Sequence, residues 1–486
     1  MSRALRVPLA AALLAAPTVL AFFSGGYFGV THGQVGVLAA ALAWLLAALV
    51  LALEPRPFPQ MRAGRVALTG LASLSAWTAL SLAWSPVLDP GLADAERVAL
   101  YLAAFLVGGA VLRDGPVRRT VTPALLAGVG IVCAYALATR CLPGIFEVTP
   151  GLRAGSRLEQ PLTYWNALGA LAAMGLVLAF ALAGDATRPG AARAAAAAVA
   201  PALGLTLFLT ISRGALAAAL VGAVVLVALA RDRRTTGAAL LSGALVAALV
   251  ALASRFPAVV ELSGDDSARE SEGLAVLALA LAAGAGGALG QLVLIRAEAR
   301  PGGWTRVVER RRPLAIAVAL LAVASLAVGM AAFARGDAEP ARRGVLAQDP
   351  SRLRTLETNR WRYWDVALES FGADPLLGSG VHGFAAEWLL RRDIDEAAQD
   401  AHSLYVETLG ELGLPGFALL LAFAGGAAVA LFRSRDAGWA AGGAVWLVHT
   451  GVDWDWEMPA LTLVFVALAA AASATAASTT SAGSAE

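Results

Sequence analysis

Residues 194–230 read AAAAAVAPALGLTLFLTISRGALAAALVGAVVLVALA, and Arg213 is the one charged residue in that run. A helix crosses the hydrocarbon core of a bilayer with about 20 apolar residues, so this run is too long for a single crossing. The chain must therefore reverse near Ser212 and Gly214, on either side of Arg213. The run predicts two antiparallel membrane helices joined by a tight hairpin.

The composition of the whole chain indicates the same class of protein. Of the 486 residues, 58% are hydrophobic and 15% are charged, and the mean hydropathy is +0.70. These values exclude an ordinary soluble domain and are typical of integral membrane proteins with many spans. The net charge of +2 says little about partners, and we expect membrane lipids but no nucleic acid among them. Two cysteines, Cys133 and Cys141, indicate neither a disulfide framework nor a metal site.

Apolar runs of membrane-spanning length recur along the chain. They predict an all-α polytopic integral membrane helix bundle of about 12–14 transmembrane helices. The first run follows Arg3 and Arg6 as a signal peptide would, but with so many later spans we expect a retained helix. The expected helices lie near residues 7–24, 34–53, 65–84, 96–112, 121–139, 162–183, 194–211, 214–230, 236–254, 274–295, 313–334, 403–432, 437–452 and 458–474.

The distribution of arginine predicts the orientation. With a cytoplasmic N-terminus, the arginine-rich connectors, such as RDGPVRR and RAEARPGGWTRVVERRR, all fall inside, as the positive-inside rule requires. We therefore expect a transmembrane bundle over residues 1–334 and an extracytoplasmic lid of short helices over 335–402, which we term the outer segment. Further membrane helices over 403–474 and a disordered cytoplasmic tail over 475–486 would follow. The predicted location is the cytoplasmic (inner) membrane of a bacterium, with the active site facing outward.

Arg213 lies at an electrostatically unfavourable position in this topology. It falls in an outer hairpin, against the inside preference of arginine, and at the start of the next helix, where the helix dipole already gives a positive potential. Such a position suits an anion. The structural alternative is an arginine that extends to lipid headgroups.

Arg360 lies in an apolar stripe of the outer segment. A helix from Leu353 would place Leu356, Trp364 and Arg360 on one face, with Leu368 and Phe371 further along it. An arginine on a buried face needs an anion. A carboxylate would be a structural partner, whereas a phosphate would be a functional one.

His402 stands at the start of the helix that re-enters the membrane. A neutral imidazole there can take a proton from a hydroxyl group near neutral pH, so His402 is a candidate general base. His449 and Asp453, four residues apart on a later helix, are expected to form a structural pair. Glu407 and Glu411 are expected to face away from His402, which disfavours a paired-carboxylate glycosidase.

Five stretches together resemble the O-antigen ligase and O-antigen polymerase superfamily. They follow the family's order from residue 157 to residue 460, although no single motif would identify it. They are SRLEQPLTYWNALGALAAMG, TISRGALAAALVG, NRWRYWDVALESFGADPLLGSGVHGF, DAHSLYVETLGELGLPG and WLVHTGVDWDWEMPA. Two features depart from the family: Ser403 stands where Asn is frequent, and the expected spans exceed the usual dozen or so.

The resemblance implies a membrane glycosyltransferase of cell-surface polysaccharide synthesis. Its donor would be a glycan linked through pyrophosphate to a polyprenyl carrier, and its acceptor a hydroxyl of another glycan, a lipid or a cell-wall polymer. No cofactor, nucleotide sugar or metal is implied. Carried over to this chain, the functional residues would be Arg213, Arg360 and His402. From the same motifs we expect substrate contacts from Asn166, Trp364, Ser403, Tyr405 and Asp453.

Two other classes of function remain open from the residues. A lipid-linked oligosaccharide flippase or polysaccharide exporter should show related halves and charged groups near the bilayer midplane. In this chain the charges stay near the expected helix ends. A structural subunit of an assembly complex would leave Arg360 on its apolar stripe without explanation.

Overall fold

The structure, a computed structural model, describes residues 1–27, 30–146, 154–230, 232–298 and 358–475. Within those ranges every regular element is helical, so the predicted all-α class is confirmed. The helices are α1 (Arg3–Ala21), η1 (Ser24–Gly26), α2 (Val30–Leu53), α3 (Arg62–Ser81), α4 (Leu88–Val111), α5 (Gly115–Arg118), α6 (Val121–Cys141), α7 (Trp165–Gly184), α8 (Gly190–Leu209), α9 (Arg213–Leu229), α10 (Arg233–Ala253), α11 (Pro257–Val260), α12 (Asp266–Glu298), α15 (Arg360–Ala373), α16 (Gly383–Arg391), α17 (Leu404–Arg433), α18 (Ala437–His449), η3 (Asp455–Glu457) and α19 (Pro459–Ser473).

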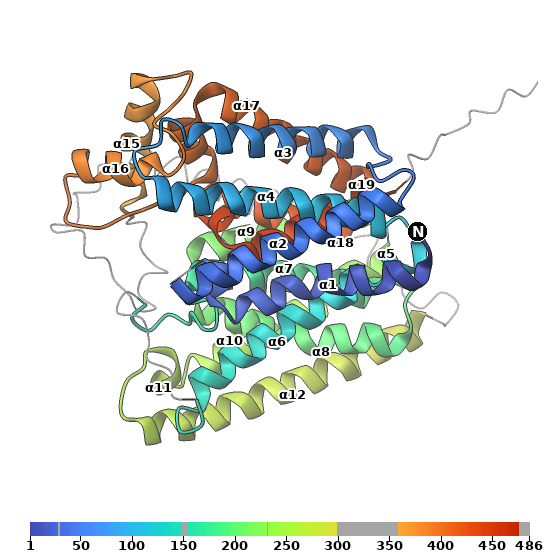
Figure 1. The fold of residues 1–486 in the computed structure, drawn as a ribbon. Helices are drawn as coiled ribbons and strands as arrows, with labels where there is room; N and C mark the ends of the chain where they lie inside the picture. Colours follow the sequence, from blue (N-terminus) through green and yellow to red (C-terminus); the bar gives the residue numbers. More distant parts are fainter. Residues whose placement is uncertain (28–29, 147–153, 231, 299–357, 476–486) are drawn as a thin grey trace, which may run out of the picture.

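The long helices lie side by side in one bundle, with α3 and α17 along one side and α8 and α12 along the other (Figure 1). Helices α7, α18 and α19 form the interior, and every residue of α19 is buried. Helix α9 packs against both α7 and α18. The interior helices α7 and α18, with α9 packed against them, therefore set the positions of the residues at their ends.

Eight helices in the described ranges are long and apolar enough to cross a membrane, and two shorter apolar helices, α9 and α19, accompany them. Large apolar side chains on the long helices are exposed on the bundle surface, for example Leu45 at 69% and Leu281 at 76% exposure. A surface of this kind is expected where lipid replaces water. The hairpin predicted around Arg213 is confirmed, because α8 ends at Leu209 and α9 begins at Arg213. The span expected near 313–334 and nearly all of the tail lie outside the described residues.

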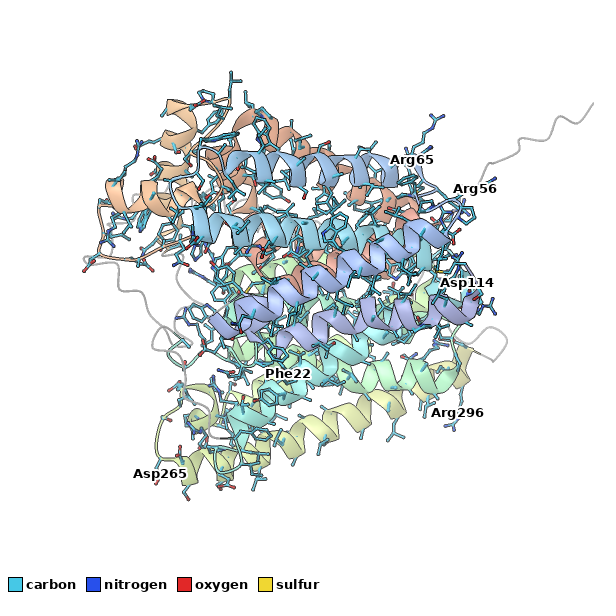
Figure 2. All side chains as sticks on the ribbon, in the orientation of Figure 1. Phe22, Arg56, Arg65, Asp114, Asp265 and Arg296 are labelled. Atoms are coloured by element: carbon cyan, nitrogen blue, oxygen red, sulfur yellow. The ribbon has the colours of Figure 1, made fainter. Side chains whose placement is uncertain are left out.

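The two ends of the bundle differ. Figure 2 places Arg56, Asp114 and Arg296 at the end that also carries the N-terminus, and Asp265 at the opposite end. The short helices α11, α15 and α16 lie at that opposite end. Among the described residues, Arg56, Asp114 and Arg296, from connectors expected to be cytoplasmic, therefore lie at one end, and Asp265, from a connector expected outside, lies at the other.

Helix α17 is bent where the outer segment meets it. Gly413 has φ 62° and ψ −167°, a backbone conformation open essentially to glycine alone, and Pro415 follows. A Cβ at Gly413 would lie 2.5 Å from the carbonyl oxygen of Leu376, and the Leu414 amide donates to the Pro375 carbonyl at 2.9 Å. The bend thus brings the turn between α15 and α16 into direct contact with α17.

Helix α4 begins earlier than the sequence indicated. The stretch SPVLDPGLADAE was expected as a connector, with a helix from residue 96, but the helix already begins at Leu88. Asp89 lies in its first turn, where a carboxylate is favoured by the helix dipole. The longer helix carries Asp94 and Arg97 into the protein, where they pair at 2.7 Å.

Candidate functional site

Arg360 and Asp453 form an ion pair between the outer segment and the bundle. Arg360 is the first residue of α15, and its Nη2 lies 2.5 Å from Oδ2 of Asp453, which follows α18 and is wholly buried. Burial alone would raise the pKa of the Asp453 carboxyl, but Arg360 holds it below its usual value. Of the two anions considered for Arg360, the structure therefore contains the carboxylate.

A second set of hydrogen bonds holds Asp453 from the other side. The Tyr164 hydroxyl donates to Oδ1 of Asp453 at 2.6 Å, and the Trp454 amide donates to the same oxygen at 3.0 Å. The Asn166 side-chain amide in turn donates to the Tyr164 hydroxyl at 2.8 Å. Asn166 and Asp453, predicted from separate motifs, are thus joined through Tyr164. Tyr164 lies in the same motif as Asn166 but was not among the predicted contact residues.

His402 is held with its ring in one tautomer. Its Nδ1 lies 3.0 Å from the backbone carbonyl oxygen of Asp400. A carbonyl can only accept, so Nδ1 carries the proton and Nε2 keeps a lone pair. Burial lowers the pKa of His402 below its usual value, which keeps the imidazole neutral. These are the properties required of a general base.

Aromatic rings surround His402. Its ring lies 5.0 Å from that of Tyr363 on α15 and 6.2 Å from that of Trp454. Trp454 also lies 4.2 Å from the Tyr164 ring. Trp454 therefore connects His402 with the group around Asp453.

The turn that carries Arg213 is strained and tightly packed. Ile211 has φ +52°, a conformation that is rare for a β-branched residue. Ser212 caps α9, because its hydroxyl accepts from the Ala215 amide at 3.3 Å. On the far side, a Cβ at Gly214 would lie only 3.2 Å from Nε2 of His449. Arg213 is half-buried. Through the neighbouring Gly214, its turn packs against His449, the last residue of α18, which lies four residues before Asp453.

The remaining predicted contact residues have packing roles in this state. The Ser403 hydroxyl caps α17 by accepting from the Val406 amide at 3.4 Å. The Tyr405 hydroxyl donates to the Leu447 carbonyl at 2.8 Å, which ties α17 to α18. Trp364 packs edge-on against Trp361 at 4.8 Å. Their contact with a substrate stays a prediction.

Two expectations were wrong, one about the partner of His449 and one about the buried face of α15. His449 pairs with Asp455, not with Asp453, because α18 ends at His449 and the following turn directs Asp453 toward Arg360. In α15 the buried face carries Tyr363 and Val366 rather than the predicted stripe, and Leu368 is 46% exposed. The helix begins only at Arg360 in the described residues, and the stretch before residue 358 lies outside them.

Sequence reasoning also missed a buried polar network beside the site. Its centre is the ion pair of Asp94 and Arg97 on α4, to which His382 of the outer segment adds a contact of 2.9 Å with Asp94. Arg97 also pairs with Glu457 of η3. This network could not be predicted, because its residues stand in separate stretches of the sequence, where they are typical of solvated charges in connectors.

Carboxylates of α17 complete this network. Glu411 accepts from the His382 and Phe384 amides at 3.1 and 3.0 Å, and Glu407 accepts from the Ala401 amide at 2.6 Å. Burial raises the pKa of Asp400 to about 6. Ligand oxygens of Asp400, Glu407 and Glu457 lie within 4.8 Å of one another, so these three residues could hold a cation. Arg97 already supplies positive charge there.

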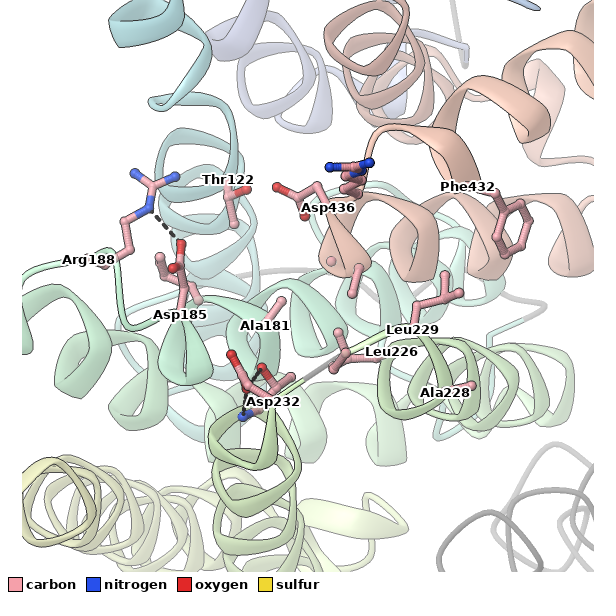
Figure 3. Close-up of a pocket in the computed structure, with 16 residues that line it drawn as sticks. Thr122, Ala181, Asp185, Arg188, Leu226, Ala228, Leu229, Asp232, Phe432 and Asp436 are labelled. Atoms are coloured by element: carbon pink, nitrogen blue, oxygen red, sulfur yellow. Dashed lines mark hydrogen bonds and ion pairs between the residues drawn. The ribbon is translucent and has the colours of Figure 1, made fainter. Parts of the chain in front are cut away.

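A cavity of about 610 Å³ lies elsewhere, at the opposite ends of the helices that form the site (Figure 3). Thr122, Asp185, Asp232 and Asp436 are among its lining residues. The site residues lie near the first residues of α7, α9 and α17, whereas this cavity lies near their last. It is therefore separate from the candidate site.

Comparison with known proteins finds a family match for part of the chain. A search of curated proteins gave no match. The model of the family described as O-antigen ligase matches residues 273–421, which include Arg360 and His402 and leave Arg213 and Asp453 outside. The matched region and the multi-helix bundle support an O-antigen ligase- or polymerase-like membrane enzyme of a bacterium. Residues 273–421 are thus similar to the O-antigen ligase family, over about a third of the chain.

Proposed function

We propose that the protein is a glycosyltransferase that moves a glycan from a polyprenyl pyrophosphate carrier to an acceptor hydroxyl, on the outer face of the cytoplasmic membrane. The observation that carries the proposal is the convergence of Arg360, His402 and the Arg213 turn on residues 449–454, at and just after the end of α18, in a chain whose residues 273–421 match the O-antigen ligase family.

Arg360 and Arg213 would bind the pyrophosphate. A guanidinium has five N–H donors and can hold a phosphate oxygen while it keeps one bond to a carboxylate. Asp453 would then orient Arg360 before the substrate arrives. As the bond from the anomeric carbon to the pyrophosphate oxygen breaks, its electron pair stays on the pyrophosphate, and the two arginines stabilise that charge.

His402 would act as the general base. Its Nε2 takes the proton of the acceptor hydroxyl while the hydroxyl oxygen forms the new bond to the anomeric carbon. Attack on the face opposite the leaving group inverts the configuration at that carbon. The proton then passes from His402 to solvent or to the released pyrophosphate, which restores the neutral imidazole.

The outer segment would cover the reacting groups. Helix α15 carries Arg360, and its Tyr363 ring lies on His402, so this helix contributes to both halves of the site. Exclusion of water by such a cover favours transfer over hydrolysis.

The proposal is tested with purified protein in lipid vesicles that contain a polyprenyl-pyrophosphate glycan as donor. Mass spectrometry would follow the length of the glycan on the carrier and on added acceptors. We expect transfer that is lost in Arg213→Ala, Arg360→Ala and His402→Ala, with Arg362→Ala as the control because its partner Asp393 is 67% exposed. Full transfer by all three variants would refute the proposed site. Movement of intact glycan across the bilayer without bond cleavage would point to a flippase or exporter.

A further inference from the structure

A buried imidazole and carboxylate lie directly behind the Arg213 turn. His449 is the last residue of α18 and Asp455 the first of η3, and both are 0% exposed. Nδ1 of His449 is hydrogen-bonded to Oδ2 of Asp455. The mechanism proposed above uses neither residue.

The pair fixes which ring nitrogen carries a proton. The Asp455 carboxylate can only accept, so Nδ1 of His449 donates to it, and in a neutral ring Nε2 then keeps its lone pair. Within the described part of the chain, Nε2 is buried and has no hydrogen-bond partner. A buried nitrogen without a partner is costly and calls for an explanation.

That nitrogen points at the start of α9. A Cβ at Gly214 would lie 3.2 Å from Nε2 and 3.3 Å from Cδ2 of His449, so the edge of the ring lies against the second residue of the helix. The N–H groups in the first turn of a helix lack partners within the helix and create a positive potential. A lone pair is therefore favourable at this point, whereas an N–H group would be repelled.

The same turn of the chain supports the other site residues. The Thr450 carbonyl, next to His449, accepts from the Leu404 amide at 2.9 Å, two residues after His402. Asp453, four residues after His449, holds Arg360. A small movement of His449 would therefore change the distances from Arg213 to Arg360 and to His402.

We propose that His449 is a positioning residue for the transfer reaction. Held by Asp455, it presents Nε2 to the first turn of α9 and so fixes the direction of Arg213 relative to Arg360. The strained Ile211 beside Arg213 agrees with a turn that is held in place by its neighbours. This inference rests on the proposed function, because its effect is on the reaction at Arg213.

Two substitutions of His449 separate its two nitrogens. The amide of His449→Asn occupies the position of Nδ1, keeps a donor for Asp455 and leaves the Nε2 position empty. The amide oxygen of His449→Gln reaches the Nε2 position and supplies an acceptor there. In the vesicle assay we expect His449→Asn to lower kcat by roughly tenfold to a hundredfold, the range that misplacement of a reacting group produces. His449→Gln should recover most of that loss.

Three further measurements distinguish a positioning role of His449 from a general structural one. The KM for the acceptor and the pH midpoint set by His402 should not change in His449→Asn, because His449 contacts neither. Gly214→Ala leaves the imidazole and carboxylate in place but pushes on Nε2, so it should lower kcat and combine non-additively with His449→Asn. Gly425→Ala is the matched control, because a Cβ there meets no atom within 4 Å.

The outcomes assign any failure to one of the two proposals. Wild-type kcat in both His449→Asn and Gly214→Ala, with transfer still lost in Arg213→Ala, would overturn the inference about His449 alone. Equal losses in His449→Asn and His449→Gln would also overturn it, because packing rather than Nε2 would then be responsible. Full transfer in Arg213→Ala, Arg360→Ala and His402→Ala would instead overturn the proposed function.

Discussion

The backbone N–H of Leu404 donates to the carbonyl oxygen of Thr450 at 2.9 Å, which joins the start of α17 to the end of α18. His402 therefore sits beside the turn whose Asp453 holds Arg360. Residues that lie far apart in the sequence are positioned by one short stretch of backbone, residues 449–453.

The ion pair of Arg360 and Asp453 should show strong coupling. Arg360→Ala leaves a buried carboxylate without its cation, and breaking such a pair costs roughly 3–5 kcal/mol. Asp453→Asn removes the charge, so the double variant should be more stable than Arg360→Ala. The measurement is thermal unfolding of the four proteins in one detergent. Additive losses would show that the two side chains do not depend on each other.

The rate of transfer should fall at acid pH as His402 becomes protonated. Burial lowers the pKa of His402 below the usual histidine value of about 6.5, so the neutral, basic form persists to a more acidic pH than for a free imidazole. At saturating donor, kcat should stay level through neutral pH and decline only below about pH 6.5. His402→Ala should lose roughly 10²–10⁴-fold in kcat and lose this decline. A decline that survives in His402→Ala would assign the titration to another group.

The contact of His382 with Asp94 should make the protein less stable at alkaline pH. Although burial opposes the charged form, the Asp94 carboxylate raises the pKa of His382 from 6.5 to about 9. A raised histidine pKa gives stability that is fully present below the unfolded pKa and is lost as the pH rises through about 9. The apparent melting temperature of the wild type should therefore fall between pH 7 and 10 more steeply than that of His382→Gln. Parallel curves for the two proteins would count against the ion pair.

The bend of α17 should not tolerate a side chain. Gly413→Ala places a Cβ at a positive φ and 2.5 Å from the Leu376 carbonyl oxygen, so it should destabilise the protein by at least about 1–3 kcal/mol. Gly425→Ala in the same helix has open space and should be neutral or stabilising by roughly 0.5–1 kcal/mol. Limited proteolysis of the outer segment should be faster in Gly413→Ala than in Gly425→Ala. Similar proteolysis and stability in both variants would show that the bend does not hold the outer segment.

The helices and the Arg213 hairpin could be predicted because they depend on local sequence. A run of apolar residues has to cross the membrane, and its length fixes where it must turn back, as at Ser212. That Arg360 has an anionic partner could also be predicted, since an arginine among apolar residues needs an anion. Its partner could not, because Asp453 is 93 residues away and the sequence pattern joined Asp453 to His449 instead.

The buried polar network could not be predicted for a related reason. Asp94, His382 and Glu411 each stand in a stretch that reads as a connector or helix end, and only the packing of α4, α17 and the outer segment brings them together. Tyr164 was hidden in the same way, since a tyrosine next to a tryptophan at a helix start is also typical of an interfacial aromatic belt.

Three turns at the site hold non-glycine residues at positive φ: Thr163 at +59°, Ile211 at +52° and His402 at +55°. Each such conformation costs of order 1–3 kcal/mol. A laboratory selection for heat resistance alone should therefore find relief at these turns early, for example as Ile211→Gly or Thr163→Gly. The variants that survive the highest temperatures should be poor catalysts, and a homologue from a hot environment should keep the three turns and gain its stability in the lipid-facing helices.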